Sequence, residues 1–139
     1  MIVARQDVQR RRWWVIARLG VFAVWLALVV FMSSRHVFWR DEGRALSIAL
    51  QGDGWGEMLV RLRGEGHPAV WYVLLRAVHG MIAGAAVLPV VAISAISVAA
   101  LMLLFLSPFP LWLVGLILAT GPFLFEYSVM ARNYGISAR

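Results

Sequence analysis

The sequence predicts an all-α integral membrane protein with three transmembrane helices, and three observations carry this prediction. Of its 139 residues, 62% are hydrophobic and 14% are charged, whereas soluble domains average about 25% charged residues. The stretches 85–106 and 110–125 contain no ionisable side chain. Three consecutive arginines, 10–12, stand directly before another apolar run. This composition excludes an ordinary soluble domain, a disordered tail and a disulfide-stapled secreted module.

The net charge of +6 comes from arginine alone, because the chain has no lysine. Basic residues beside an apolar run orient it, with the basic end in the cytoplasm. We therefore interpret arginines 10–12 as a topology signal and expect no nucleic-acid partner. The absence of cysteine excludes thiol catalysis, thiolate metal sites and disulfides.

The first predicted span covers 13–32, after a cytoplasmic N-terminus at 1–12. A transmembrane helix needs about 20 apolar residues, and only Arg18 interrupts this run. Because Arg18 is near the start, we expect its side chain to snorkel toward the lipid headgroups. A cleaved signal peptide is the alternative. We favour an uncleaved span, since the run is longer than a signal core and no small-residue cleavage site follows cleanly.

The second and third predicted spans, 85–106 and 110–125, form a hairpin. Between them lies a short cytoplasmic turn at 107–109, where the prolines at 108 and 110 interrupt helical structure. The remaining segment, 126–139, is then external.

The segment 68–84 decides whether the chain has three spans or four. It is short for a span and holds Arg76 and His79 near its middle, where charge is costly in a bilayer. A helix starting at Pro68 would place Tyr72 on one face with these two residues. The opposite face would be an apolar stripe of Trp71, Leu74, Leu75 and Val78. We therefore expect a helix lying along the membrane surface, with 33–84 forming one external loop.

Two further short helices are predicted within this loop. Asp41 and Glu42 begin the first, which ends near Gly52, and acidic residues at a helix start also have a simple interpretation as caps. The second helix is expected from Gly54 to Arg63, with Asp53 as its cap. Its apolar face would consist of Trp55, Met58, Leu59 and Leu62.

In this order, the segments resemble the N-terminal part of the GT-C superfamily of membrane glycosyltransferases. The resemblance is nearest to bacterial protein mannosyltransferases and the lipid A aminoarabinose transferase. It rests on three matches: the acidic pair in WRDEGR (39–44), the run GHPAVWYVLLR (66–76), similar to the family's HPPLYYLLLR, and the segment 126–134, similar to yysqeaRmY. Ala69 replaces the family's second proline. Family members are far longer, so we expect this chain to be truncated at its C-terminus.

The resemblance implies transfer of a sugar from a polyprenyl-phosphate carrier to a glycan, lipid or protein acceptor on the external face. It implies the bacterial inner membrane, with membrane lipid as a further partner and no organic cofactor. Asp41 matches the catalytic position and is assigned as general base, with Glu42 orienting it or holding a divalent metal ion. Glu126 is a second, looser metal candidate.

The leaving phosphate would need cationic donors, and arginine supplies a charged, two-pronged donor. Arg44, three residues after Asp41, is the first candidate for this role. The other candidates are His67, Arg76, Arg132 and Tyr134. A lone histidine before a proline also has a structural interpretation, and Tyr and Arg at a span end also serve as interface anchors.

Two alternatives remain. One is a non-catalytic small membrane protein, such as a transport or assembly subunit whose charged loop binds a partner. The other is a transporter fragment in which Arg76 and His79 line a path. Transporters place ionisable groups within their spans, whereas the second and third predicted spans have none, so this alternative is the weaker.

Overall fold

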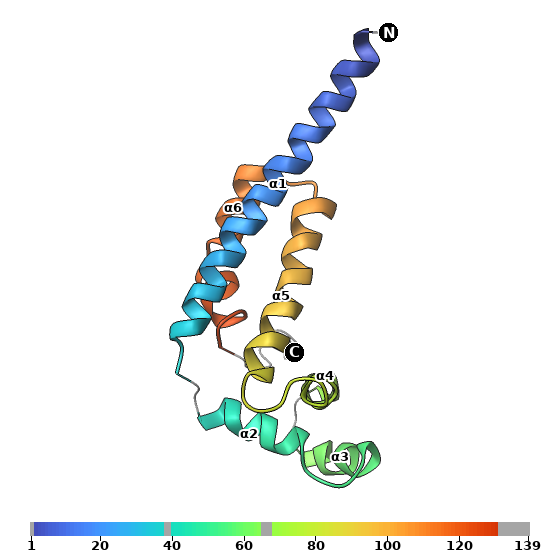
Figure 1. The fold of residues 1–139 in the computed structure, drawn as a ribbon, viewed down its shortest axis with the longest axis vertical. Helices are drawn as coiled ribbons and strands as arrows, with labels where there is room; N and C mark the ends of the chain where they lie inside the picture. Colours follow the sequence, from blue (N-terminus) through green and yellow to red (C-terminus); the bar gives the residue numbers. More distant parts are fainter. Residues whose placement is uncertain (1, 38–39, 65–67, 131–139) are drawn as a thin grey trace.

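The computed structural model describes residues 2–37, 40–64 and 68–130. All regular structure in these ranges is helical (Figure 1), which confirms the all-α prediction. In chain order the elements are α1 (Ile2–Arg35), α2 (Arg40–Ala49), α3 (Trp55–Arg61), the 3-10 turn η1 (Leu62–Gly64), α4 (Ala69–His79), α5 (Val87–Leu106), α6 (Leu111–Leu118) and the π-helical turn η2 (Pro122–Glu126).

Two of the described helices, α1 and α5, are long and apolar enough to cross a membrane. They contain the first and second predicted spans. Their apolar windows are only 17% and 33% buried, so most of their apolar surface faces outward. An all-round apolar helix in a soluble protein would be covered by the rest of the fold. The outward apolar surface therefore agrees with the membrane class that the composition predicts.

The third predicted span, 110–125, is not one continuous helix. α6 ends at Leu118, and the wider turn η2 begins at Pro122 after a bend. Gly121 loses much backbone entropy in a helix, and Pro122 has no N–H to donate to the preceding turn. The backbone closes a larger ring here instead, with Tyr127 N–H donating to the Pro122 carbonyl at 2.9 Å. The eight residues of α6 extend only about 12 Å.

The long elements pack side by side. Figure 1 shows α1 running along α5 and α6, with its N-terminal part extending beyond both. Apolar side chains from the three helices form one buried cluster: Trp25, Val29, Ile96, Ala100, Leu104, Val114 and Leu118. This cluster packs α6 against α1. α6 alone is too short to cross a bilayer core of about 30 Å.

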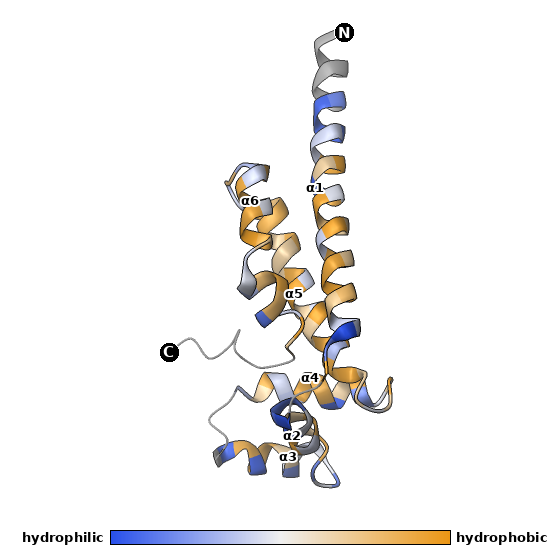
Figure 2. Cartoon of the chain, turned by 90° about the vertical axis from the view of Figure 1, so that its left-hand side faces the viewer, coloured by the Kyte–Doolittle hydropathy of each residue, from blue (hydrophilic) through white to orange (hydrophobic). Residues whose placement is uncertain are grey.

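The short helices α2, α3 and α4 gather at the other end, across the direction of α1 and α5 (Figures 1 and 2). α4 has 11 residues and is therefore about 16 Å long, half of a bilayer core. Its length and direction favour the predicted surface helix over a fourth span. α2 and α3 overlap the helices expected in the loop, whereas α4 ends at His79, before the Gly84 boundary of the expected surface segment.

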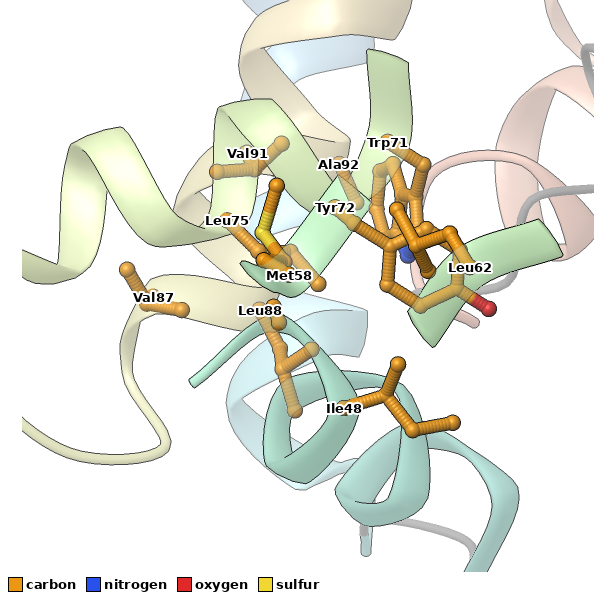
Figure 3. Close-up of a cluster of buried hydrophobic side chains, with 11 residues drawn as sticks. Ile48, Met58, Leu62, Trp71, Tyr72, Leu75, Val87, Leu88, Val91 and Ala92 are labelled. Atoms are coloured by element: carbon orange, nitrogen blue, oxygen red, sulfur yellow. The ribbon is translucent and has the colours of Figure 1, made fainter. Parts of the chain in front are cut away.

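A second buried cluster joins the short helices to the start of α5 (Figure 3). Met58 and Leu75 are completely buried within it, and burial of such a side chain contributes about 1.5–3 kcal/mol. Tyr72 differs from its predicted place on a polar face, because it is 2% exposed beside Trp71, whereas Leu74 is 39% exposed. The reason is that α4 contacts both α2 and α5, so its buried face is wider than one stripe.

Two smaller expectations are corrected. The N-cap of α3 is Gly54, and the side chain of Asp53 makes no capping bond there. Instead the Asp53 N–H donates to Glu57 Oε2 at 3.1 Å. Arg18 does not snorkel outward: it is 6% exposed, and its guanidinium lies 3.9 Å from the ring centroid of Trp14. Trp14 in turn contacts Phe105 edge to face, so the end of α5 covers this part of α1.

Candidate functional site

The candidate site begins where α1 ends. After Arg35 the chain leaves the helix, and the His36 N–H still bonds to the Ser33 carbonyl at 3.2 Å. α2 then starts at Arg40, so that Asp41 and Glu42 lie in its first turn. The positive end of the helix dipole favours both carboxylates at this position. The acidic pair is therefore located at the end of α1 opposite the arginines 10–12.

The two carboxylates have different environments. Glu42 is buried, and its Oε2 and Oε1 atoms lie 3.2 and 3.3 Å from Nε2 of His36. The side chain of His36 is itself 7% exposed. The imidazole and the carboxylate therefore form a buried hydrogen-bonded pair. Asp41, one residue earlier, is exposed.

The turn η2, which is distant in sequence, packs against the pair formed by His36 and Glu42. The ring of Phe125 contacts the His36 ring edge to face, with the centroids 6.3 Å apart. η2 is thereby placed beside the end of α1, and Glu126 follows Phe125 as an exposed side chain. Ser128, two residues later, is completely buried, and its Oγ has no hydrogen-bond partner among the described residues. The C-terminal acidic segment and the α2 acidic pair thus adjoin the same end of α1.

Arg44 is exposed on α2. Its spacing of three residues from Asp41 places both on one side of the helix. A carboxylate and a guanidinium at this spacing provide, on one surface, a proton acceptor and a group that donates hydrogen bonds to an anion. The roles of Asp41 and Arg44 stay predictions.

Arg76 has a structural position. Its Nη1 donates to the carbonyls of Ala49 and Gln51 at 3.2 and 3.1 Å, and its Nη2 donates to the Gly52 carbonyl at 3.0 Å. These carbonyls lie at the end of α2, where helices leave acceptors without intrahelical partners. The guanidinium therefore fastens α4 to α2. This geometry does not favour the phosphate-binding role predicted for Arg76.

Three predicted site residues, His67, Arg132 and Tyr134, lie outside the described residues. In the part of the chain that the structure describes, no three His, Asp or Glu side chains gather to hold a metal ion. A divalent cation at Glu42 or Glu126 thus stays a prediction. Calcium takes six to eight oxygen ligands and magnesium six, far more than either carboxylate provides.

An apolar hollow of about 350 Å³ opens between α1 and the α6 segment. Its lining consists of Gly20, Val21, Val24, Trp25, Leu28, Gly115, Leu118, Ala119 and Leu124. Leu28 lies eight residues before His36, which corresponds to about 12 Å along a helix. The hollow therefore approaches the acidic pair from the hydrocarbon-facing part of the molecule.

His36 is the site residue that sequence reasoning missed. A histidine six residues before a glutamate, with the end of one helix between them, follows no helical or strand spacing. The available signal was weaker: an imidazole at the end of a span, just before two acids. Comparisons of the chain with protein-family models, curated proteins and solved structures find no match, so the site is interpreted from its own geometry.

Proposed function

We propose that this chain is the N-terminal part of a membrane glycosyltransferase of the GT-C type, which transfers a sugar from a polyprenyl phosphate to an external acceptor. In this proposal α1, α5 and the broken segment formed by α6 and η2 cross the bacterial inner membrane, and the short helices lie at its outer surface. One observation carries the proposal: at the end of an apolar helix, an exposed Asp41 adjoins a Glu42 that is buried against His36. In this pair, Asp41 is the carboxylate that reacts and Glu42 is the carboxylate that positions it.

Asp41 acts as the general base. It accepts the proton of the acceptor hydroxyl while the hydroxyl oxygen attacks the anomeric carbon. The bond from that carbon to the phosphate oxygen breaks, and its electron pair leaves with the polyprenyl phosphate. Attack and departure occur on opposite sides of the carbon, so the configuration inverts.

Cationic side chains stabilise the phosphate as negative charge develops on it. Arg44 is the first donor, because it is exposed on the same side of α2 as Asp41. His67, Arg132 and Tyr134 are the further donors that the family resemblance suggests. Arginine suits this role because its planar fork donates two hydrogen bonds to phosphate oxygens and stays charged.

The apolar hollow supports a lipid-linked donor over a soluble nucleotide sugar. A polyprenyl chain needs an apolar surface within the membrane, close to the site that holds its phosphate. The hollow between α1 and α6 has an apolar lining and approaches the acidic pair along α1. A nucleotide sugar would gain nothing from such a surface.

The test is sugar transfer from a radiolabelled polyprenyl-phosphate sugar, measured at two chain lengths. We expect the purified 139-residue chain to bind a polyprenyl phosphate in detergent but to transfer no sugar, because the remaining helices of the fold complete the groove. In the longer protein that the resemblance implies, Asp41→Asn should reduce transfer about 10²-fold or more. The matched control is Asp53→Asn, an exposed carboxylate of the same loop, which should leave transfer unchanged.

Near-normal turnover of Asp41→Asn would remove Asp41 from the mechanism. Transfer by the 139-residue chain would contradict its expected inactivity. If the short chain binds no polyprenyl phosphate and the longer protein transfers no sugar, the non-catalytic membrane subunit becomes the better interpretation.

A further inference from the structure

Arg18 is a buried cation of α1 that the proposed reaction does not use. It is 6% exposed, and its Nε and Nη1 atoms have no hydrogen-bond partner among the described residues. One face of the guanidinium is stacked over the Trp14 ring at 3.9 Å. Stacking on an aromatic face offsets part of the cost of burying a cation, but it leaves the in-plane N–H groups without acceptors. Buried polar groups without partners are rare in native proteins.

Arg18 belongs to a stripe that continues onto the extended end of α1. Arg10, Arg11 and Trp14 line an open hollow of about 550 Å³. The spacing of four residues from 10 to 14 and from 14 to 18 places these side chains on one side of the helix. Trp14 contacts Phe105 near the end of α5, so the hollow starts where α5 stops. Figure 2 shows a hydrophilic band on α1 at this level, followed by apolar helix.

We propose that this stripe binds the phosphate of an anionic phospholipid. Arg10 and Arg11 supply exposed guanidinium groups, and Trp14 supplies an amphipathic ring of the kind that lies at headgroup level. Arg18, stacked on the Trp14 ring that lines the hollow, is the deepest donor of the stripe. The negative phosphate gives the buried guanidinium a counter-charge and gives its N–H groups oxygen acceptors. This site is independent of the acidic pair at the opposite end of α1.

A lipid is favoured over free phosphate by the position of the stripe. The arginines lie where polar helix gives way to apolar helix, which is the level of lipid phosphates. Basic residues at this level attract the anionic lipids of the cytoplasmic leaflet, and the positive-inside rule assigns this end of α1 to the cytoplasm. The apolar faces of Trp14 and Phe105 lie beside the cations and suit the upper part of an acyl chain.

The experiment measures lipid retention by the full chain in a neutral detergent, using native mass spectrometry. The probes are a phosphatidylglycerol and a phosphatidylcholine with the same acyl chains. We expect phosphatidylglycerol to be retained at least about tenfold more strongly than phosphatidylcholine. Arg18→Gln and Arg11→Gln should each reduce this retention about tenfold, the effect expected when one hydrogen bond to a charged group is lost.

The matched control is Arg12→Gln. Arg12 has the same charge at nearly the same depth, but two residues before Trp14 it points to another side of α1. Retention in this variant should change less than twofold. Arg11→Gln keeps the test valid if Arg18→Gln fails to fold, because Arg11 is exposed. Circular dichroism checks folding of all three variants.

Three results would overturn the proposal. Equal losses for Arg11→Gln and Arg12→Gln would mean general attraction by the basic segment and no defined site. Equal retention of the two lipids would exclude recognition of net negative charge. Displacement of phosphatidylglycerol by an equal concentration of inorganic phosphate would identify free phosphate, and not a lipid, as the ligand.

Discussion

His36 Nε2 lies 3.2 Å from Glu42 Oε2, and this contact joins the end of α1 to the first turn of α2. Both side chains are buried, and the ring of Phe125 packs against the histidine. Three segments therefore meet at one imidazole: the end of an apolar helix, the helix that carries the acidic pair, and η2. Any movement of α2 away from α1 would expose Glu42 and break this contact.

We expect Glu42→Gln and His36→Ala each to destabilise the junction of α1 and α2 by about 1.5–3 kcal/mol, the usual contribution of a hydrogen bond to a charged group. Hydrogen exchange of the amides in α2, measured in detergent by mass spectrometry, should become correspondingly faster. Glu57→Gln is the matched control, because Glu57 is an exposed glutamate and exposed ion pairs contribute little. Unchanged α2 exchange in His36→Ala would show that the imidazole does not hold Glu42.

Arg76 should stabilise the packing of α4 against the end of α2 through its three hydrogen bonds. Arg76→Gln loses the bonds to three carbonyls, and we expect a loss of about 2 kcal/mol in the free energy of unfolding. Arg76→Lys should recover little, since an ammonium group does not reproduce a planar fork that reaches all three acceptors. Unfolding of the purified chain in denaturant, followed by circular dichroism, measures both variants.

Arg61→Gln is the control for Arg76, because Arg61 forms an exposed pair with Glu57 and its loss should destabilise the chain much less. If Arg76→Lys were as stable as the original chain, charge alone would explain the role of Arg76. The phosphate-binding interpretation would then regain support.

The sequence was sufficient to predict the helical class, α1 and α5, and the three short helices of the loop, because composition and apolar spacing determine these features locally. It placed Asp41 and Glu42 at the start of a helix for the same reason. The break in the third span depends on how Gly121 and Pro122 compete with a strongly apolar run, which periodicity alone does not decide. Arg76 bonds to carbonyls that lie 24 to 27 residues earlier in the chain, and His36 contacts Glu42, six residues later. Both contacts join separate helical segments, so no local pattern reveals them.

The absence of cysteine gives a silent background for mapping topology. Single cysteines at Ser47 and Ser137 should both react with a membrane-impermeant thiol reagent in intact cells. Ser47 is exposed on α2, and Ser137 lies outside the described residues. Labelling at Ser47 but not at Ser137 would place the two acidic segments on opposite sides of the membrane and would contradict the proposed site.

Glu57 should give α3 an acid-sensitive contact. The hydrogen bond from Arg61 Nη2 at 2.7 Å, the Asp53 N–H and the charge of Arg61 together lower the pKa of Glu57 below its ordinary value. A lowered pKa means that the ionised form is favoured by folding. The stabilisation is therefore complete above the ordinary pKa and disappears as the pH falls through the lowered pKa.

We expect the Asp53 amide to exchange faster once the pH falls below this range, after correction for the intrinsic pH dependence of exchange. Glu57→Gln should remove that extra acid dependence. The carboxyl carbon shift of Glu57, followed by NMR, should titrate below that of an unfolded peptide with the same residues. A titration at the ordinary position would contradict the Arg61 contact.

Gly52 should resist substitution because of its backbone conformation. Its φ of +80° lies in the left-handed region, which costs residues with a Cβ about 1–2 kcal/mol. A Cβ at this position would also lie 2.8 Å from the carboxyl carbon of Glu57, and the exposed Glu57 side chain would have to shift to accommodate it. Gly52→Ala should therefore lower the free energy of unfolding by at least about 1 kcal/mol and weaken the adjacent bond from Arg76 to the Gly52 carbonyl.

Gly56→Ala, in the same loop, should raise the free energy of unfolding, the opposite of the effect expected for Gly52→Ala. Gly56 lies in α3 with no neighbour within 4 Å of an added Cβ, and alanine is favoured over glycine in a helix by about 1 kcal/mol. Denaturant unfolding of the two variants should therefore move in opposite directions from the original chain. Equal stability of Gly52→Ala and the original chain would mean that the turn after α2 adopts another backbone conformation, and the three-carbonyl contact of Arg76 would then require a different geometry.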